Sequence, residues 1–133
     1  MSIVQLRYAT LPFIGFIARH YWFVVFDESG ECHRWEVWQR SNAGGVSVGH
    51  LHCDLKPPDA GVGGGPMHIA AEWKGDEARR LRKVLESSSY PHCHRYRMWP
   101  GPNSNTFVAW VLRKAGVEHN LGAKALGKRY PVA

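Results

Sequence analysis

The stretch WPGPNSNTF, residues 99–107, constrains the fold more than any other part of this chain. Pro100 and Pro102 each fix one φ angle, and Gly101 between them permits a backbone conformation that other residues resist. The next four residues, 103–106, are all of types that favour turns and helix N-termini. The stretch therefore predicts a rigid turn that leads directly into a helix.

That helix is expected over residues 104–115. Apolar residues recur at helical spacing as far as Ala115, and Gly116 suits the left-handed residue that ends many helices. Ser104 then lies in the first turn, where free backbone N–H groups and the positive end of the helix dipole converge. A hydroxyl group at this place is well sited for nucleophilic chemistry, because the same N–H groups can receive an oxyanion.

A β-hairpin is predicted in the first third of the chain. Residues 13–26 are rich in aromatic and β-branched side chains, residues 27–30 are turn formers, and residues 32–40 alternate as a returning strand. If paired residue numbers sum to 56 or 58, His20 and Glu36 share a face of the hairpin, directly or diagonally opposite. A slip by one residue would move Glu36 to the other face.

The remaining pattern predicts a single α+β domain over residues 1–133. Further strands are expected at residues 3–8, 46–53, 67–73 and 92–98, and a second helix at residues 75–87. Strands outnumber helices, so the sheet should be mostly antiparallel, or closed into a small barrel, with two main helices. The Pro- and Gly-rich connection over residues 56–66 lacks its own secondary structure and is expected to be mobile or functional.

Charge is distributed unevenly. Residues 1–73 hold five Lys or Arg and seven Asp or Glu, net −2, whereas residues 74–133 hold twelve and four, net +8. The basic half, with Trp99 near several arginines, could bind nucleic acid, although a solvated basic helix face explains it more simply. No signal peptide is recognisable and Arg19 and His20 interrupt the longest apolar run, so we expect a cytoplasmic protein without a membrane span.

The residues with catalytic potential are Ser104 as nucleophile, His20 as base and Glu36 as the group that orients the base. Asn103 or Asn105 would assist the backbone N–H groups in holding an oxyanion. The alternative is that His20 is a satisfied core histidine, Glu36 a solvent-facing residue and Ser104 one of several redundant caps. Trp22 and Trp99 adjoin these residues in sequence and are predicted to belong to the same pocket, which they could also fill.

Several motifs resemble an uncharacterised bacterial family, a domain of unknown function. The longest match is residues 100–112, and His20-Tyr21-Trp22 matches the family's early His-x-Trp. The segments Gly75-Asp76-Glu77-Ala78, Tyr96-Arg97-Met98-Trp99 and Ala125-Leu126-Gly127-Lys128-Arg129-Tyr130 also resemble family motifs. The chain departs from the family at Arg129, where Asp is usual, and at residues 122–124, where Pro and Thr are usual. The family supplies no activity.

A more distant resemblance is to circularly permuted papain-like proteins, which include amidases, acyltransferases and peptidases. They place a His on an early strand, a polar or acidic residue on the next strand, and an Asn-Cys-x-x-Phe motif at a helix N-terminus. Residues 103–107 resemble that motif, with Ser104 in the position of the Cys. The resemblance implies a permuted papain-like fold and action on an amide, ester or thioester of a small molecule, lipid or peptide. A Ser, unlike a Cys, does not ionise near neutral pH, so the chain could instead be a non-catalytic ligand- or peptide-binding module.

A metal site is the remaining alternative. His50, His52, Cys53 and Asp54, together with Cys32 and His33 and with His92, Cys93 and His94, are residue types that bind zinc. The sequence contains no Cys-x-x-Cys and no His-x-x-x-His pair, and its three cysteines are an odd number. We therefore expect neither a metal nor another cofactor.

Overall fold

The computed structural model describes residues 2–12, 18–87 and 89–132. Its strands are β1 (Ile3–Thr10), β2 (Arg19–Phe26), β3 (Cys32–Val37), β4 (Val46–Val48), β5 (Leu51–Cys53) and β6 (His68–Lys74), and its helices are α1 (Gly75–Glu86) and α2 (Ser104–Ala115). The α+β class with two main helices is confirmed. In the described part of the chain, no helix is both long enough and apolar enough to cross a membrane.

All six strands join one antiparallel sheet in the order β4-β5-β3-β2-β1-β6. As built from the described residues, this sheet is open, with β4 and β6 at its edges, so the predicted antiparallel sheet is confirmed and the barrel is not. The hairpin of β2 and β3 lies in the middle, and its paired residue numbers sum to 58, as in Phe23 with Trp35. This is one of the two registers that put His20 and Glu36 on one face.

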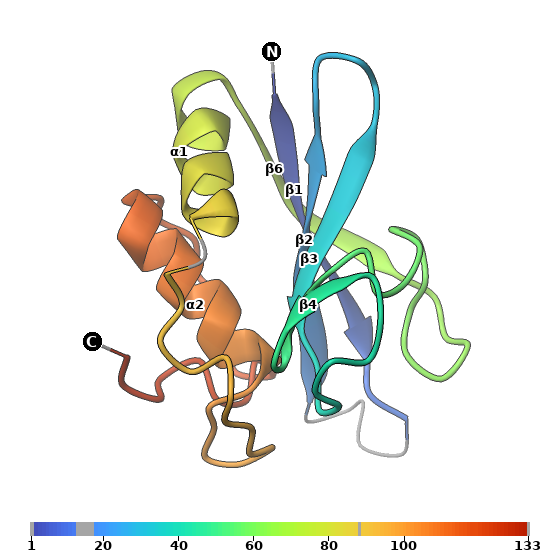
Figure 1. Ribbon diagram of the computed structural model, residues 1–133. Helices are drawn as coiled ribbons and strands as arrows, with labels where there is room; N and C mark the ends of the chain where they lie inside the picture. Colours follow the sequence, from blue (N-terminus) through green and yellow to red (C-terminus); the bar gives the residue numbers. More distant parts are fainter. Residues whose placement is uncertain (1, 13–17, 88, 133) are drawn as a thin grey trace.

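Both helices cover the same face of the sheet (Figure 1). The main core lies between them and the strands, where Leu6 and Phe23 from the sheet meet Leu81 of α1 and Val111 of α2. The opposite face carries a smaller cluster around Trp22 and Val24. Because both faces of β2 are covered, nearly every residue of this strand is buried.

The connection between β5 and β6 covers that opposite face. Arg7 donates hydrogen bonds to the Pro58 carbonyl (3.1 Å) and Asp59 (2.6 Å), and Trp22 Nε1 donates to the same carbonyl (3.3 Å). The segment predicted to be mobile or functional is therefore fixed in place by side chains of β1 and β2.

Helix α2 begins and ends as the sequence predicts. Asn103 is its N-cap: its Oδ1 accepts from the backbone N–H of Asn105 and Thr106, and Thr106 Oγ1 accepts from the Asn103 N–H. Gly116 follows the helix with φ 68°, a left-handed conformation that glycine adopts without strain. These two capping residues explain why the bounds of this helix are readable locally.

Three predicted strands differ from those observed. Residues 46–53 form the two short strands β4 and β5, because Gly49 (φ 60°) turns the chain between them. The returning strand of the hairpin ends at Val37, short of residue 40. Residues 92–98 form turns and irregular backbone without a strand partner. The prediction for residues 13–26 holds from Arg19 onward, and residues 13–17 lie outside the described residues.

Candidate functional site

A buried chain of polar contacts links β2 to β3. His20 Nε2 lies 3.0 Å from Glu36 Oε1, and the exposed fractions of these residues are 2% and 0%. Arg34, also 0% exposed, donates from Nη2 to Glu36 Oε1 (3.1 Å) and from Nε to Glu36 Oε2. The predicted pairing of His20 with Glu36 is thus present in the structure, and Arg34 completes it.

Arg34 stabilises a carboxylate that would otherwise be costly to bury. A buried charge is tolerated only when it is paired and its remaining hydrogen bonds are made. The other side of the guanidinium donates to the carbonyls of Pro57 (3.0 Å) and Ala60 (2.6 Å), and its carbon lies 4.0 Å from the centre of the Trp22 ring. The connection between β5 and β6 therefore covers the side of Arg34 that faces away from Glu36.

The charge states follow from these contacts. Burial alone would raise the pKa of Glu36, but the hydrogen bond with His20 and the positive charge of Arg34 outweigh it and hold the pKa well below its usual range. Burial lowers the pKa of His20, although Glu36 opposes this shift. At neutral pH the site therefore holds an ionised Glu36 and a neutral His20. Since a carboxylate only accepts hydrogen bonds, the His20 proton sits on Nε2 and its Nδ1 has a free lone pair.

Two tryptophans hold the imidazole ring in place. The Trp22 ring stacks against His20 at 5.5 Å between centroids, and the edge of Trp38 contacts it at 5.0 Å. Trp22 thus packs on the face of the His20 ring and does not line the cavity that His20 shares with Ser104. Sequence reasoning assigned no role to Trp38, although it shares a strand face with Glu36.

Asn105 joins the N-terminus of α2 to the strand that carries His20. Its Oδ1 accepts from the Tyr21 N–H (3.2 Å), and its Nδ2 donates to the carbonyls of Arg19 (2.8 Å) and Leu126 (3.0 Å). These contacts flank His20 on both sides along β2. They bring the first turn of α2, and with it Ser104, to the strand end where His20 lies.

The amide of Asn105 has no further hydrogen to offer, because both of its Nδ2 hydrogens are engaged. Asn103 Nδ2 donates one hydrogen to the Met98 carbonyl (2.8 Å) and has a second hydrogen left. Among the described residues, nothing accepts a hydrogen bond from the Ser104 N–H. The start of α2 therefore offers two donors to an oxyanion, the backbone N–H of Ser104 and the amide of Asn103.

Ser104 and His20 line one small cavity of about 70 Å³. Asn103 and Asn105 line it too, and its remaining walls are Leu11, Ala18, Arg19, Trp38, Gln39, Tyr96, Met98 and Leu126. Neither Trp22 nor Trp99 is among these residues. Trp99 is 69% exposed and lines a larger groove nearby, so the space beside Ser104 is not filled by either tryptophan.

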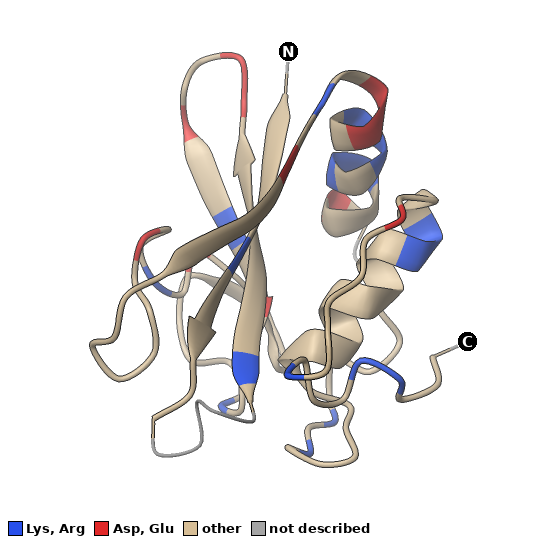
Figure 2. Cartoon of the chain, turned by 180° about the vertical axis from the view of Figure 1, so that it is seen from behind, with Lys and Arg blue, Asp and Glu red and all other residues tan. Residues whose placement is uncertain are grey.

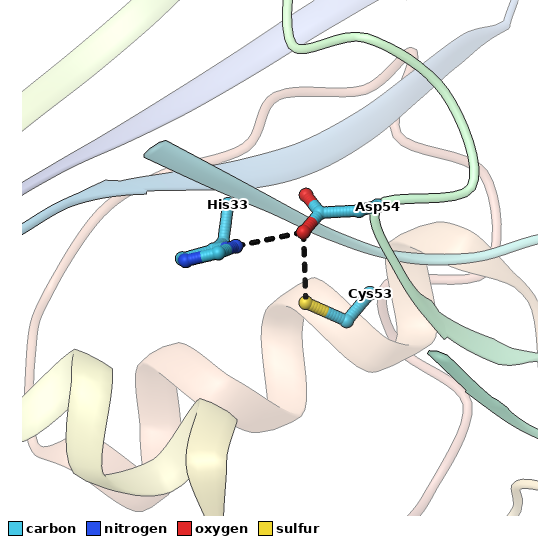
Figure 3. A group of neighbouring side chains, drawn as sticks. All are labelled: His33, Cys53 and Asp54. Atoms are coloured by element: carbon cyan, nitrogen blue, oxygen red, sulfur yellow. Dashed lines mark hydrogen bonds and ion pairs between the residues drawn. The ribbon is translucent and has the colours of Figure 1, made fainter. Parts of the chain in front are cut away.

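Of the metal-ligand candidates, the structure brings together His33, Cys53 and Asp54 (Figure 3). His33 Nδ1 lies 2.7 Å from Asp54 Oδ2, and Cys53 Sγ lies 3.8 Å from the same oxygen. Burial and the nearby carboxylate raise the pKa of Cys53 to about 12, so its thiol keeps its proton at neutral pH. Hydrogen bonds within the group account for this arrangement without an ion.

The basic residues of α1 are mostly paired. Figure 2 shows acidic and basic residues side by side on this helix. Asp76 forms salt bridges with Arg79 and Arg80, and Glu86 forms one with Arg82. Arg80 also donates to the Ala115 carbonyl at the end of α2 (2.6 Å). These contacts neutralise much of the charge that the sequence places here.

Comparison with known protein families matches residues 1–130 to a family described as "Protein of unknown function (DUF3750)". The chain belongs to this family, which confirms the predicted membership of a domain-of-unknown-function family. No match was found among curated proteins, and none among solved structures.

Proposed function

We propose that this member of the DUF3750 family is a hydrolase or acyltransferase that acts on an amide, ester or thioester through Ser104, His20 and Glu36. One observation carries the proposal: His20 uses Nε2 to contact a buried, ionised Glu36, and it lines the same cavity as a serine at a helix N-terminus. These are the three parts of a nucleophile, a base and a group that orients the base.

The reaction begins when Ser104 Oγ attacks the carbonyl carbon of the substrate. Nδ1 of His20 takes the hydroxyl proton as the new C–O bond forms, and Glu36 stabilises the resulting imidazolium without accepting its proton. The tetrahedral intermediate collapses when the bond to the leaving amine, alcohol or thiol breaks and that group takes the proton from Nδ1. Water or an acceptor alcohol then attacks the carbonyl carbon of the acyl-serine, and Nδ1 takes its proton. The bond from that carbon to Ser104 Oγ then breaks, Nδ1 returns the proton to Oγ, and the acid or the new ester leaves.

The negative charge of the intermediate falls at the N-terminus of α2. The Ser104 N–H and the second Nδ2 hydrogen of Asn103 are the donors that face it, and the helix dipole adds a favourable field. The order of His20, Glu36 and Ser104 along the chain also resembles that of permuted papain-like enzymes. A serine in place of cysteine makes proton removal by His20 necessary in the first step.

A fluorophosphonate probe tests this proposal. It reacts with activated serines, so the wild type should be labelled and Ser104→Ala should not. Ser47→Ala, which removes a serine on the edge strand β4, is the matched control and should be labelled like the wild type. Labelling of Ser104→Ala, or no labelling of the wild type, would contradict a serine enzyme.

The second candidate is a non-catalytic module that binds a ligand or peptide on the same scaffold. Three features favour it, and two of them are that the cavity is only about 70 Å³ and that Ser104 is 6% exposed. Among the described residues, no hydrogen bond joins Ser104 Oγ to His20. A wild type that binds a ligand in this cavity but stays unlabelled by the fluorophosphonate would favour the binding module.

Nucleic-acid binding is the third candidate, and the paired arginines of α1 weaken it. An electrostatic complex should lose affinity steeply as the salt concentration rises. Titration of a fluorescent single-stranded oligonucleotide at two salt concentrations measures this. Affinity that stayed constant with salt would exclude the electrostatic form of this candidate.

A further inference from the structure

A larger groove adjoins the cavity of Ser104. Its volume is about 720 Å³, and it lies between Trp99 and Pro100 on one side and segments of residues 120–131 on the other. The mechanism proposed above uses none of its lining side chains. Its position next to the reacting atoms makes it the natural place for the part of a substrate that is remote from the scissile bond.

The wall between cavity and groove is anchored to the start of α2. Leu126 lines both spaces, and its carbonyl accepts from Asn105 Nδ2 (3.0 Å). The Gly127 carbonyl accepts from Thr106 Oγ1 (2.7 Å). The groove is therefore held at a fixed place relative to the helix turn that carries Ser104.

The charge of the groove is positive. Lys128 and Arg129 line it, and none of its described lining residues is acidic. Within the described chain, neither cation forms a salt bridge. Glu118 lines a neighbouring hollow together with the same two cations. Lys128 Nζ donates to the Gly122 carbonyl (2.6 Å), which leaves the guanidinium of the exposed Arg129 as the less engaged charge.

The groove also presents an unusual apolar surface. Trp99 is 69% exposed, although an indole of this size normally buries most of its area. Tyr130 and Pro100 are further apolar walls. An aromatic side chain in a groove with a cation such as Arg129 suits a ligand that combines a flat apolar group with a negative charge.

We infer that this groove binds the remote part of the substrate, and that this part carries an oxyanion, carboxylate or phosphate, attached to a planar apolar group. The inference rests on the proposed function for the reaction at Ser104, but the binding itself does not need that reaction. Arg129 holds the oxyanion and Trp99 stacks on the apolar group. Selectivity for such substrates then comes from the segment 120–131 and not from the catalytic residues.

Binding of three probes of one shape tests this inference. They are 2-naphthoate, 2-naphthyl phosphate and neutral 2-naphthamide, titrated calorimetrically into the Ser104→Ala chain so that no turnover occurs. We expect the better of the two anions to bind about tenfold more tightly than the amide, the effect of one charge-assisted contact. The tighter anion identifies whether a carboxylate or a phosphate is the preferred group.

Two matched arginine variants locate the effect. Arg129→Gln should reduce the preference for the anion to about twofold or less, whereas Arg79→Gln, on the exposed face of α1, should preserve it. Trp99→Ala should weaken all three probes. Equal affinities for anions and amide, no measurable binding of any probe, or equal effects of the two arginine variants would overturn the inference.

The result of the probe titrations can be distinguished from the result of the fluorophosphonate test of the proposed function. If fluorophosphonate labelling fails while the anion preference and its dependence on Arg129 are observed, the serine enzyme is wrong and the groove is a binding site. If labelling succeeds and the anion preference is missing, the enzyme stands and the inference about its substrate is wrong.

Discussion

The protein contains the same chemical pair, a histidine beside a carboxylate, in two settings. His20 and Glu36 are almost fully buried, whereas the side chains of His33 and Asp54 are 44% and 43% exposed. The distances are similar, 3.0 Å and 2.7 Å, yet the pKa of His20 is lowered by burial and the pKa of His33 is raised by its hydrogen bond to Asp54. Environment, more than contact geometry, decides whether the pKa of the imidazole is lowered or raised.

Arg34 contributes to both settings in different ways. Its guanidinium neutralises Glu36, while its backbone N–H donates to Asp54 Oδ1 (2.9 Å). The buried pair thus has a guanidinium as countercharge, and its histidine, His20, lines a cavity together with Ser104. We therefore expect changes to the two pairs to have unequal effects on stability, pH dependence and labelling.

The largest expected effect comes from Glu36→Gln. It leaves the buried guanidinium of Arg34 without a countercharge and should cost about 3–5 kcal/mol in the free energy of unfolding. Asp54→Asn, the matched change in the exposed pair, should cost about 1 kcal/mol or less. Urea unfolding of both variants measures this, and equal losses would refute the contrast between the two pairs.

The next effect comes from two glycine positions, one against the N-cap of α2 near Ser104 and one against Cys53 and Asp54 of the exposed pair. At Gly127 (φ 92°) a Cβ would lie 2.3 Å from Asn103 Nδ2, and at Gly45 (φ 58°) it would lie 2.3 Å from the Cys53 carbonyl oxygen. Each change to alanine should cost about 1–3 kcal/mol through crowding and backbone strain. We expect Gly127→Ala also to lose fluorophosphonate labelling, because it displaces the cap of α2. Gly45→Ala should still be labelled, and its loss of labelling would show that general destabilisation explains both.

The two histidines should affect the pH dependence of stability in opposite directions. The folded-state pKa of His20 lies below its unfolded value of about 6.5, so its contribution is present above that pH and lost as the pH falls. The folded-state pKa of His33 is raised, so its contribution is present at lower pH and lost as the pH rises. Between about pH 7 and pH 5, His20→Gln should flatten the loss of stability on acidification and His33→Gln should steepen it. Unfolding curves across this range would contradict the assignment if both variants shifted the slope in the same direction.

The smallest expected effect concerns metal. Because hydrogen bonds already join His33, Cys53 and Asp54, we expect protein purified without a His tag to lack stoichiometric zinc, and a chelator to leave its melting temperature unchanged. Elemental analysis and a thermal melt with EDTA check this. Stoichiometric zinc, with a lower melting temperature after chelation, would make the exposed pair a metal site.

The features of the fold and of the candidate site that could be predicted from the sequence are those determined by residues close together in the chain. The bounds of α2 follow from Asn103 and Gly116, and the shared face of His20 and Glu36 follows from the hairpin register. The role of Arg34 could not be predicted, because an alternating arginine usually faces solvent. It is buried only because the connection over residues 54–67 crosses that face, which is a long-range contact.

Two further differences between prediction and structure, at residues 92–98 and at Asn105, also arise from long-range contacts. A strand over residues 92–98 needs a neighbouring strand, and no local pattern shows whether one is free. The contact of α2 with β2 depends on Asn105, whose side chain was predicted to assist an oxyanion. This side chain accepts a hydrogen bond from the Tyr21 N–H and donates one to the Arg19 carbonyl, on either side of His20. These contacts join residues more than 80 positions apart, so the sequence does not show them.

The most direct test of the proposed site is to map the fluorophosphonate adduct by mass spectrometry in the wild type and in His20→Gln. We expect one adduct per chain, on Ser104, formed about 100- to 10,000-fold more slowly in the variant because the general base is gone. An adduct on another serine, no adduct, or an equal labelling rate in His20→Gln would contradict the assignment of Ser104 and His20 as nucleophile and base.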